Sequence, residues 1–545
     1  MTPTDRSDRG GHDQRFWTHA QQLEKQPPCQ VECPNSGNVR GWLGIIAQRH
    51  KHGLSLAQAY DRAWEELAQR NPFPATIGRI CPHPCESRCT RSDKDGAVSI
   101  NALERFLGDW GIDRKLPLPR IEGQRNTESI GVIGSGPAGL SFAYQMARRG
   151  YTVTIYERQI QPGGMLRGVI PDYRLPRKLL DAEIERLFEL DMSVIRGVEL
   201  GKDITLEELR ERHDILFLGI GAHGARRLGI PGESGPGVMA GLGYLRRRKL
   251  GMNSGLGKQV VVIGGGNTAI DAARSARREG ATVTVLYRRT RKEMPAACDE
   301  VDDAGIEGVN FTWRSVPVRI LREGSDVTGI EYHLKQPGEP DKLMRLAADS
   351  IIVAISQEPD WQGLDLSRDG HKWLHTEEDG RLDDDIWAGG DDRGPGIASR
   401  SVAQGRIAAE SAHAQLRGEP RPLPGPQEID AGVVKSGYYD GHDRGEHPRR
   451  PPEQWLEQPE LEIDLTISSE QACEEAARCM SCGLCFDCHQ CVMYCNAGGY
   501  SGVEDAAPGR YFRLALELCE GCGKCIELCP CGYLEAREES PLVAD

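Results

Sequence analysis

Residues 131–157 read GVIGSGPAGLSFAYQMARRGYTVTIYE, and this stretch decides the fold of the region around it. An apolar run leads into a glycine-rich turn, a helical segment follows, and a second apolar run ends at Glu157. Gly134, Gly136 and Gly139 have the G-x-G-x-x-G spacing, which allows the tight turn, the approach of a pyrophosphate and the packing of helix on strand. The stretch predicts a Rossmann-type dinucleotide-binding unit; the alternative is a glycine-rich turn that binds no ligand.

The residues around this turn define the expected cofactor contacts. The phosphates of a dinucleotide would meet the start of the helix, where unpaired N–H groups favour an anion. Glu157 ends the second strand, where a carboxylate can accept a hydrogen bond from an adenosine ribose hydroxyl. We assign to this first site the residues Gly134, Gly136, Pro137, Ala138, Gly139, Glu157 and, in the loop-rich run that follows, Gly164.

A second stretch of the same kind occupies residues 259–289, QVVVIGGGNTAIDAARSARREGATVTVLYRR. Its G-x-G-x-x-A turn and helix start supply the expected contacts Gly264, Gly266, Asn267, Thr268 and Ala269. Where an NAD site prefers an acid at the end of the second strand, this stretch has Arg288 and Arg289, whose guanidinium groups could clamp a 2′-phosphate. The pattern favours NADP(H) over NAD(H), unless these arginines are ordinary surface charges.

Two such units with opposite charge preference predict two different dinucleotides. The unit that ends in an acid is expected to bind FAD, and the basic one to bind the nicotinamide cofactor that exchanges hydride with it. Residues 386–410, IWAGGDDRGPGIASRSVAQGRIAAE, predict a strand, a turn and a helix whose N-terminus points at the flavin. Asp391 in that turn is expected to bind the ribityl chain, although a GGD turn is also common in ordinary loops. The apolar run at 350–355 is expected to return to the first sheet.

Composition limits the classes of function. The chain has 545 residues, a net charge of −14 and 18 cysteines. The negative charge argues against nucleic acid as a partner. The N-terminus shows no apolar signal region, and no run of about 18 apolar residues exists to span a bilayer. We therefore expect a cytoplasmic protein whose thiols bind metal.

The N-terminal cysteines follow helix-forming sequence between residues 16 and 67. Cys33, Cys81, Cys85 and Cys89 supply four thiolates, the number that one [4Fe-4S] cube requires. Four sulfur ligands suit zinc equally well, so spacing alone leaves both metals open.

The C-terminal cysteines show a stronger pattern. Two C-x₂-C-x₂-C-x₃-C runs occur, and in two-cluster ferredoxins the fourth cysteine of each run ligates the other cluster. One predicted ligand set is therefore Cys485, Cys488, Cys491 and Cys529. The other is Cys519, Cys522, Cys525 and Cys495. A zinc site at Cys479, Cys482, Cys485 and Cys488 is the alternative. Cys473, Cys479, Cys482 and Cys531 have no assigned role.

Taken together, GRICPHPCE, GSGPAG, GGGNTAIDAAR, YRRTRKEMPA and AGGD resemble the small subunit of glutamate synthase and its relatives. These include the N-terminal half of dihydropyrimidine dehydrogenase and the NADPH-binding subunit of transhydrogenases that reduce ferredoxin. The resemblance covers about residues 25–415. It implies an N-terminal [4Fe-4S] domain, with the cluster on the Cys33 set, and an NADP domain inserted in the FAD domain.

The chain departs from this family at both ends. The family usually has an additional C-x-x-C before the first cysteine pair, for a second N-terminal cluster, but residues 1–28 contain no cysteine. No second N-terminal cluster is therefore expected, and Cys29 lacks its usual companions. The C-terminal ferredoxin-type tail is similar to a branch that includes DsrL-like subunits accompanying dissimilatory sulfite reductase and flavoprotein subunits of some 2-oxoacid:ferredoxin oxidoreductases.

These motifs together predict an α/β protein with two Rossmann-like domains, preceded by a helical iron-sulfur domain and followed by a ferredoxin-like α+β domain. The expected domains are an iron-sulfur domain at 1–125, the FAD domain at 126–232 and 348–418, the NAD(P)H domain at 233–347, a linker at 419–470 and a two-cluster ferredoxin-type domain at 471–545. Cys298 is the one thiol between Cys89 and Cys473, which excludes a redox disulfide there, and it is expected to be a small buried side chain.

The predicted function is electron transfer between NAD(P)H and a protein partner. Electrons would pass through FAD and three [4Fe-4S] clusters to a catalytic redox protein or a ferredoxin, within a hetero-oligomer of the sulfite reductase or 2-oxoacid:ferredoxin oxidoreductase type. The alternatives are a small subunit of NADPH-dependent glutamate synthase, and a scaffold whose clusters only hold the fold together. No side chain is assigned as a catalytic acid or base, because hydride transfer depends mainly on proximity.

Overall fold

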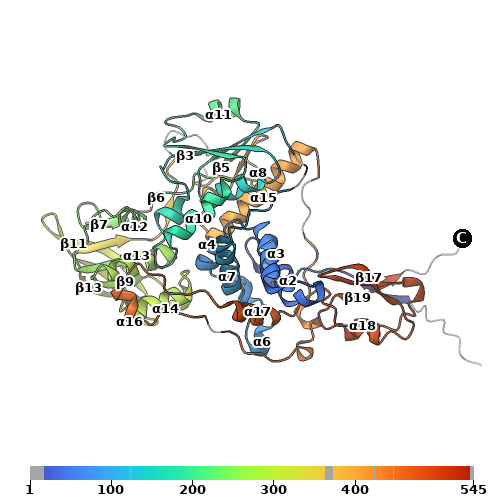
Figure 1. Ribbon diagram of the computed structural model, residues 1–545. Coiled ribbons are helices and arrows are strands. Elements are labelled where there is room, and N and C mark those ends of the chain that lie inside the picture. Colours follow the sequence, from blue (N-terminus) through green and yellow to red (C-terminus); the bar gives the residue numbers. More distant parts are fainter. Residues whose placement is uncertain are drawn as a thin grey trace, which may run out of the picture.

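The structure, a computed structural model, describes residues 17–539 except 122, 124, 362–371, 421–424 and 446. Figure 1 shows a central group of N-terminal helices, with a sheet domain above it, a second sheet domain to the left and the C-terminal cysteine-rich domain to the right. In the described part of the chain no helix is long and apolar enough to cross a membrane.

The first sheet contains the first glycine-rich turn. Its five strands are all parallel and run in the order β16-β5-β2-β3-β4. Their bounds are β2 (Ser129–Ile133), β3 (Thr152–Glu157), β4 (Met192–Arg196), β5 (Ile215–Leu218) and β16 (Ile386–Ala388). Helices α8 (Pro137–Ala147) and α15 (Ala398–Arg417) pack closely because Gly405 lies against α8, where a Cβ would overlap Ala138 O. The remaining helices of this domain are α9 (Gly164–Gly168), α10 (Arg177–Leu187) and α11 (Leu206–Arg212).

The second sheet contains the second glycine-rich turn and is also parallel. Its order is β10-β9-β8-β14-β7. The strands are β7 (Val238–Ala240), β8 (Gln259–Ile263), β9 (Thr282–Tyr287), β10 (Asn310–Trp313) and β14 (Ser350–Val353). Helices α12 (Gly241–Lys249), α13 (Asn267–Arg278) and α14 (Cys298–Ile306) belong to this domain, as does an antiparallel sheet of β11 (Ser315–Glu323), β12 (Asp326–Leu334) and β13 (Lys342–Ala347). All these strands lie in the chain between β5 and β16 of the first sheet.

One sequence-based expectation about these sheets was wrong. The apolar run at 350–355 does not return to the first sheet, because β14 pairs in parallel with β8 and with β7 of the second. A buried parallel strand has a continuous apolar sequence in either sheet, so this sequence does not indicate which strands it pairs with. The first sheet is completed instead by β16.

The N-terminal region is largely helical, as predicted. Its helices are α1 (Pro28–Glu32), α2 (Val39–Ala47), α3 (Leu56–Ala68), α4 (Pro74–Ile80), α5 (Pro84–Ser87), α6 (Ser92–Asp95) and α7 (Ile100–Asp113). A capping box formed by Ser55 and Gln58 begins α3. Helices α4 and α7 approach so closely that a Cβ on Gly108 would overlap Ala75 N. Trp42, Trp64 and Tyr60 are fully buried between these helices.

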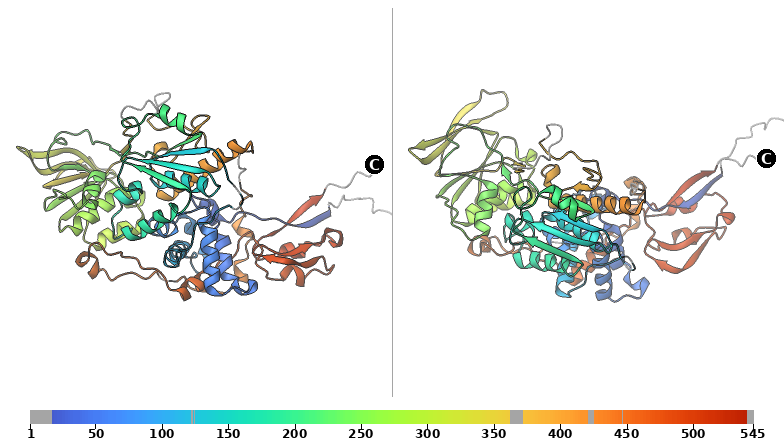
Figure 2. Two further views of the ribbon diagram at one scale, coloured as in Figure 1. Left: turned by 45° about the horizontal axis from the view of Figure 1, so that its top comes forward. Right: turned by 90° about the horizontal axis from the view of Figure 1, so that it is seen from above.

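The C-terminal domain contains the first described strand of the chain. Strand β1 (Trp17–Gln22) pairs antiparallel with β19 (Leu534–Glu539), beside a hairpin of β17 (Tyr500–Ala507) and β18 (Arg510–Leu514) and the short helices α18 (Gln490–Met493) and α19 (Lys524–Leu528). Figure 2 shows these strands standing away from the helical core. Residues 17–22 therefore lie with the far end of the chain rather than in the helical domain that the sequence predicted.

In the same way, part of the C-terminal sequence packs on the N-terminal domain. The described residues between 425 and α17 form short helical turns and α16 (Glu453–Glu457), and the side chains of Trp455 and Ile463 are buried against Tyr173. Helix α17 (Ser469–Ala477) then packs on α2 and α7, and Ala472 and Ala476 join the same hydrophobic core as the N-terminal helices. The segment that the sequence placed at the start of the ferredoxin-type domain thus belongs in space to the N-terminal domain.

Candidate functional site

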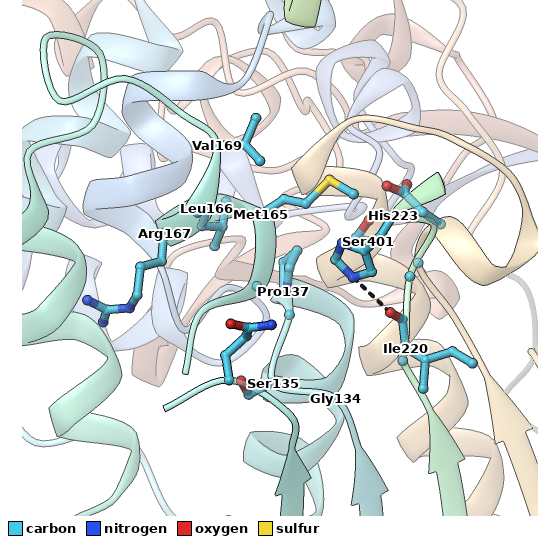
Figure 3. Close-up of a pocket in the computed structure, with 18 of the residues that line it drawn as sticks. Gly134, Ser135, Pro137, Met165, Leu166, Arg167, Val169, Ile220, His223 and Ser401 are labelled. Atoms are coloured by element: carbon cyan, nitrogen blue, oxygen red, sulfur yellow. Dashed lines mark hydrogen bonds between the residues drawn. The ribbon is translucent and has the colours of Figure 1, made fainter. Parts of the chain in front are cut away.

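A cavity of about 580 Å³ lies at the glycine-rich turn of the first sheet (Figure 3). Gly134 has a positive φ of 94°, and a Cβ there would overlap Gly219 O, so only glycine fits the turn. Gly139 packs against Gly134 O in the same way. Gly136 has nothing within 4 Å of its Cβ position and lines the cavity. The three glycines thus have the turn, packing and open positions that a bound pyrophosphate requires.

Glu157 lies at the edge of this cavity and braces the turn. It accepts hydrogen bonds from Ser135 N at 2.8 Å and Ser135 Oγ at 2.5 Å through one oxygen, and from Gln159 N at 2.7 Å through the other. Pro137 and Ala138 line the cavity at the start of α8. These contacts place the carboxylate at the expected strand end, and its bond to a ribose stays a prediction.

Asp391 and Gly164 line the same cavity from other segments. Asp391 accepts a hydrogen bond from Gly396 N at 3.1 Å, and burial raises its pKa to about 6. Gly164 has a positive φ of 52°, and a Cβ there would come within 2.8 Å of Gly136 Cα, so the loop lies tightly over the phosphate turn. The N-terminus of α15 opens onto the cavity through Ala398 and Ser401.

Two further residues, which the sequence did not indicate, contact the segment that follows β5. Asp392 is fully buried and accepts hydrogen bonds from Ile220 N and Gly221 N. His223 faces the cavity, with Nε2 3.1 Å from Ile220 O and Nδ1 3.1 Å from Arg246 Nη2. Because an arginine can only donate, Nδ1 accepts and Nε2 carries the proton. Burial, then the nearby Arg158 and Arg246, lower the pKa of His223 to about 4, so the imidazole is neutral at pH 7.

The second glycine-rich turn opens onto the same cavity from the other sheet. Gly264 has a φ of 147° and its Cβ position overlaps Ala354 O, whereas Gly266 has nothing within 4 Å. Asn267 and Thr268 line the cavity at the start of α13. Ala269, the last position of this motif, is fully buried. The two nucleotide units therefore face one shared space, which is the arrangement that hydride exchange between two cofactors requires.

Arg288 and Arg289 follow β9 directly and are both exposed. The Arg289 guanidinium lies 5.7 Å from the centre of the Tyr287 ring. Tyr287 also donates a hydrogen bond to Glu293 O at 2.8 Å, which orders the loop that follows the strand. The two arginines thus stand free at the end of the second strand, the position of the residue that distinguishes NADP from NAD.

The predicted N-terminal ligand set is only partly brought together. Cys33, Cys81 and Cys85 line one cavity together with Glu104, and Cys89 lies elsewhere. Burial, and then the carboxylate of Glu104, raise the pKa of the Cys81 thiol to about 12. Glu104, which the sequence did not single out, lines this cavity and accepts a hydrogen bond from Asn71 Nδ2 at 2.8 Å.

This cysteine cavity adjoins the large one. Ile80 lines the nucleotide cavity while the next residue, Cys81, lines the cysteine cavity. Cys81 Sγ lies 3.5 Å from the hydroxyl of Ser399, at the start of α15. The first turn of that helix therefore lines both sites.

A second group of cysteines lines a separate cavity: Cys29, Cys89, Cys479 and Cys482. In the C-terminal domain a third cavity is lined by Cys485, Cys488, Cys491 and Cys529, the set that the spacing predicted, with Cys531 Sγ 3.8 Å from Cys529 Sγ. For the last set, burial raises the pKa of the Cys525 thiol, and the neighbouring Cys519 and Cys522 add to this. Cys495 accepts a hydrogen bond from Gly499 N at 3.3 Å.

The cysteine geometry differs from that of a single-ion site. In the described ranges no three or more His, Cys, Asp or Glu side chains converge on one metal position. A cube instead binds its ligands at separate iron atoms, so the sulfurs need not meet at a point. The zinc set Cys479, Cys482, Cys485 and Cys488 is divided between two cavities. Cys298, expected to be buried, is exposed because it begins α14 at the domain surface.

Known proteins share this combination of domains. The family model for pyridine nucleotide-disulphide oxidoreductases matches residues 128–405, and that for dihydropyrimidine dehydrogenase domain II, 4Fe-4S cluster, matches residues 22–116. The glutamate synthase (NADPH) small chain of Azospirillum brasilense is 32% identical, over 72% of this chain and 86% of that one. This chain belongs to the glutamate synthase small-chain family. It therefore has a pyridine-nucleotide oxidoreductase region preceded by a 4Fe-4S domain.

Other members of the family are longer. The NADPH-Fe(3+) oxidoreductase subunit beta of Geobacter sulfurreducens is 38% identical over 64% of this chain and 53% of its own length. The NADP(+)-dependent formate dehydrogenase subunit beta of Moorella thermoacetica is 34% identical over 76% of this chain and 63% of its own. Among solved structures, Mycobacterium tuberculosis FprA in complex with NADPH covers 55% of this chain and 88% of that chain, at 18% identity and a TM-score of 0.45. The match to the two longer family members thus covers between half and two thirds of their length.

Proposed function

We infer that the protein is an NADPH-dependent oxidoreductase that passes electrons to a protein partner through FAD and [4Fe-4S] clusters. The observation that carries this function is the adjacency of Ile80 in the nucleotide cavity and Cys81 in the cysteine cavity. An FAD bound in the first cavity supplies the chemistry that accepts a hydride and releases its two electrons singly. The chain's own residues then need to position the two nucleotides, exclude water and hold the clusters.

The nucleotide cavity supports the first of these tasks. Gly136 and Gly266 leave room for a pyrophosphate on each side, and the starts of α8 and α13 present unpaired N–H groups to it. Asp391 lines this cavity and would bind the ribityl chain of a flavin, since its raised pKa suits a hydrogen bond with a hydroxyl group. His223 lines the same cavity and, as a neutral imidazole, would add no charge to it.

The cavities support ligand sets for two clusters, and the sequence spacing supports a third. Cys33, Cys81 and Cys85, with Glu104 as the fourth ligand, would hold the cluster nearest to the flavin. Cys485, Cys488, Cys491 and Cys529 would hold the third-cavity cluster, and Cys519, Cys522 and Cys525 with Cys495 the terminal one. These are the three [4Fe-4S] clusters expected from the sequence, with Glu104 in place of Cys89.

The nicotinamide cofactor is NADPH rather than NADH in this proposal. Arg288 and Arg289 stand exposed at the end of β9 and can bind a 2′-phosphate as donors. Two of the longer relatives carry NADPH or NADP(+) in their names.

The acceptor is a separate protein in the same proposal. Relatives named as subunits or chains of iron reductase, formate dehydrogenase and glutamate synthase support a place in a hetero-oligomer. A role as the small subunit of glutamate synthase is less favoured because the match to that relative covers 72% of this chain, and the ferredoxin-type domain needs a further explanation.

An anaerobic titration tests this function. The purified protein is titrated with NADPH and separately with NADH, while flavin absorbance and low-temperature cluster EPR are followed together. We expect NADPH to bleach the flavin and reduced-cluster signals to appear. A flavin that neither nucleotide reduces would refute the nucleotide assignment, and a flavin that is reduced while all clusters stay oxidised would refute the electron path.

A further inference from the structure

The cavity lined by Cys29, Cys89, Cys479 and Cys482 has no role in the function described so far. Its cysteines come from three segments that are far apart in the chain: the start of α1, the turn after α5 and the turn after α17. The cavity measures about 30 Å³, between the roughly 40 Å³ of the Cys33 cavity and the roughly 20 Å³ of the Cys485 cavity. Four cysteines around a space of this size resemble the two neighbouring ligand sets.

The C-terminal half of this cavity is held in place by buried polar bonds. Glu475 Oε1 accepts from Ser99 N at 2.7 Å, and Arg91 Nη1 donates to Arg478 O at 2.6 Å. Arg478 Nη1 donates to Ala97 O at 3.1 Å. Because these groups are buried, each bond is costly to leave unmade. The position of the Cys479–Cys482 turn on the N-terminal domain is therefore defined by the fold.

A buried arginine lies beside the four cysteines. Arg40, with 3% of its surface exposed, lines the same cavity and donates to Cys482 O at 2.7 Å. Among the described residues, Arg40 Nε has no hydrogen-bond partner. An unpartnered buried donor beside four thiols is explained by an acceptor that occupies the cavity, such as a cluster sulfide or a ligating thiolate.

We propose that Cys29, Cys89, Cys479 and Cys482 bind a fourth [4Fe-4S] cluster, in which the C-terminal pair replaces the cysteine pair that residues 1–28 lack. Cys479 and Cys482 come from the segment that folds back onto the N-terminal domain. Arg40 Nε donates a hydrogen bond to this cluster and offsets part of its negative charge. The site requires both ends of the chain.

The location gives this cluster a role as a relay. Cys29 lies in α1 and Cys33 ends it, and Cys89 closely follows Cys85 of α5, so the site adjoins the Cys33 cavity. On its other side Gly483 N donates to Cys531 O at 2.6 Å, and Cys485 follows in the next cavity. The cluster takes up one electron from the flavin side and passes one electron to the ferredoxin-type domain, with no bond made or broken. This relay rests on the proposed function, whereas the presence of the cluster does not.

Iron content and EPR test the site directly. The double variant Cys479→Ser/Cys482→Ser is compared with Cys473→Ser, a matched control on α17 whose thiol contacts Arg49 at 3.1 Å instead of another cysteine. Full-length proteins are reconstituted anaerobically with iron and sulfide. At four irons per cube, we expect about sixteen irons per chain in the wild type and the control and about twelve in the double variant, with one reduced-cluster EPR signal lost. Equal iron in all three proteins, or zinc bound by the wild type at these cysteines, would overturn the proposal.

A second variant guards against a folding defect in the first. Cys29→Ser removes a ligand from the other end of the chain and is expected to abolish the same EPR signal. Loss of a different signal would count against a shared site. NADPH bleaching of the flavin is recorded in the same samples, so that a wild type with about sixteen irons and an unreactive flavin would refute the proposed function and leave the cluster site intact.

The arginine provides a more specific readout. Arg40→Gln removes a buried positive charge and its Nε donor, and both changes stabilise the oxidised cluster relative to the reduced one. We expect the midpoint potential of this EPR signal alone to become more negative in a redox titration, with the iron content unchanged. A uniform shift of all signals, or none, would contradict the placement of Arg40 beside this cluster.

Discussion

At the scale of single residues, the choice of nicotinamide cofactor depends on two exposed arginines. Replacing them as Arg288→Asp/Arg289→Ser should raise the KM for NADPH by about tenfold or more, because each hydrogen bond to a charged group contributes about 1.5–3 kcal/mol. The KM for NADH should change little. Steady-state flavin reduction with each nucleotide measures the two KM values and their ratio.

Arg291 offers a matched control for this prediction. It lies on the same loop but forms an ion pair with Asp302, so Arg291→Ser should leave the NADPH preference unchanged. If the double variant also keeps its preference, Arg288 and Arg289 are surface charges without a role in selectivity.

The neutral histidine of the cavity makes a prediction about pH. The pKa of His223 is about 4 in the folded protein against 6.5 for a free histidine, so between these values the unfolded chain binds more protons than the folded one. The contribution of this residue to stability is therefore complete above pH 6.5 and is lost as the pH falls toward 4.

The variant His223→Gln removes this titration. Between pH 7.5 and pH 5 the Tm of the flavin-binding region should fall further in the wild type than in the variant, by about 4–8 °C, which corresponds to about 2 kcal/mol for a domain of this size. The protein's flavin fluorescence during a thermal ramp reports the Tm. An equal fall in both proteins would mean that other groups dominate acid destabilisation.

At the scale of elements, strand β1 has the least expected position. Ala20 is buried, pairs with Ala536 of β19, and its backbone N–H is hydrogen-bonded to Cys519. Proline has no N–H and would leave the Cys519 sulfur without this donor. Ala20→Pro should therefore loosen the terminal cluster, with faster loss of its EPR signal in air and faster proteolysis of the C-terminal domain.

The neighbouring residue supplies the comparison for that experiment. Gln21→Thr keeps the backbone N–H and a strand-forming side chain, so the terminal cluster should be as stable as in the wild type. If both variants lose the EPR signal of the terminal cluster equally fast, the cause is a side chain and not the backbone N–H of Ala20.

The two glycine-rich elements could be read from the sequence, because each motif specifies its own strand, turn and helix locally. Gly134, Gly136 and Gly139 lie as the spacing predicts, and the second turn repeats the pattern. The assignment of β14 failed because sheet neighbours are chosen by tertiary packing. Strand β1 was missed for the same reason, since six residues at 17–22 carry no local sign of a partner more than 500 residues away.

At the scale of the whole molecule, the cavities form a series from the nucleotides to the C-terminal domain. Removing the cluster nearest to the flavin should interrupt this series without affecting hydride transfer. In Cys81→Ser we expect NADPH to bleach the flavin at the wild-type rate while the EPR signals of the remaining clusters no longer appear. Stopped-flow absorbance with rapid-freeze EPR makes the measurement, with Cys473→Ser as the control. Normal cluster reduction in the Cys81 variant would show that electrons leave the flavin by another route.

The grouping of cysteines is also a property of the whole molecule. The C-terminal set Cys485, Cys488, Cys491 and Cys529 could be predicted because two runs have the ferredoxin spacing, in which the fourth cysteine of one run joins the first three of the other. The division of the N-terminal set could not, because Cys89 meets Cys479 and Cys482 only after α17 has folded back across the molecule. The spacing of cysteines in the sequence predicts ligands that belong to one motif. Cysteines that share a cavity can come from several segments, which only the packing of the folded chain brings together.

The docking of α17 on the N-terminal helices also has a consequence for biosynthesis. Residues 29 and 89 leave the ribosome long before residue 479, and domains generally fold in the order in which they are made. If the four cysteines share a cluster, the N-terminal half of its site waits with two open ligand positions until the last part of the chain has been synthesised. Cluster insertion there would then be a late step of maturation, and an incompletely translated chain could reduce its flavin without having a completed outlet for the electrons.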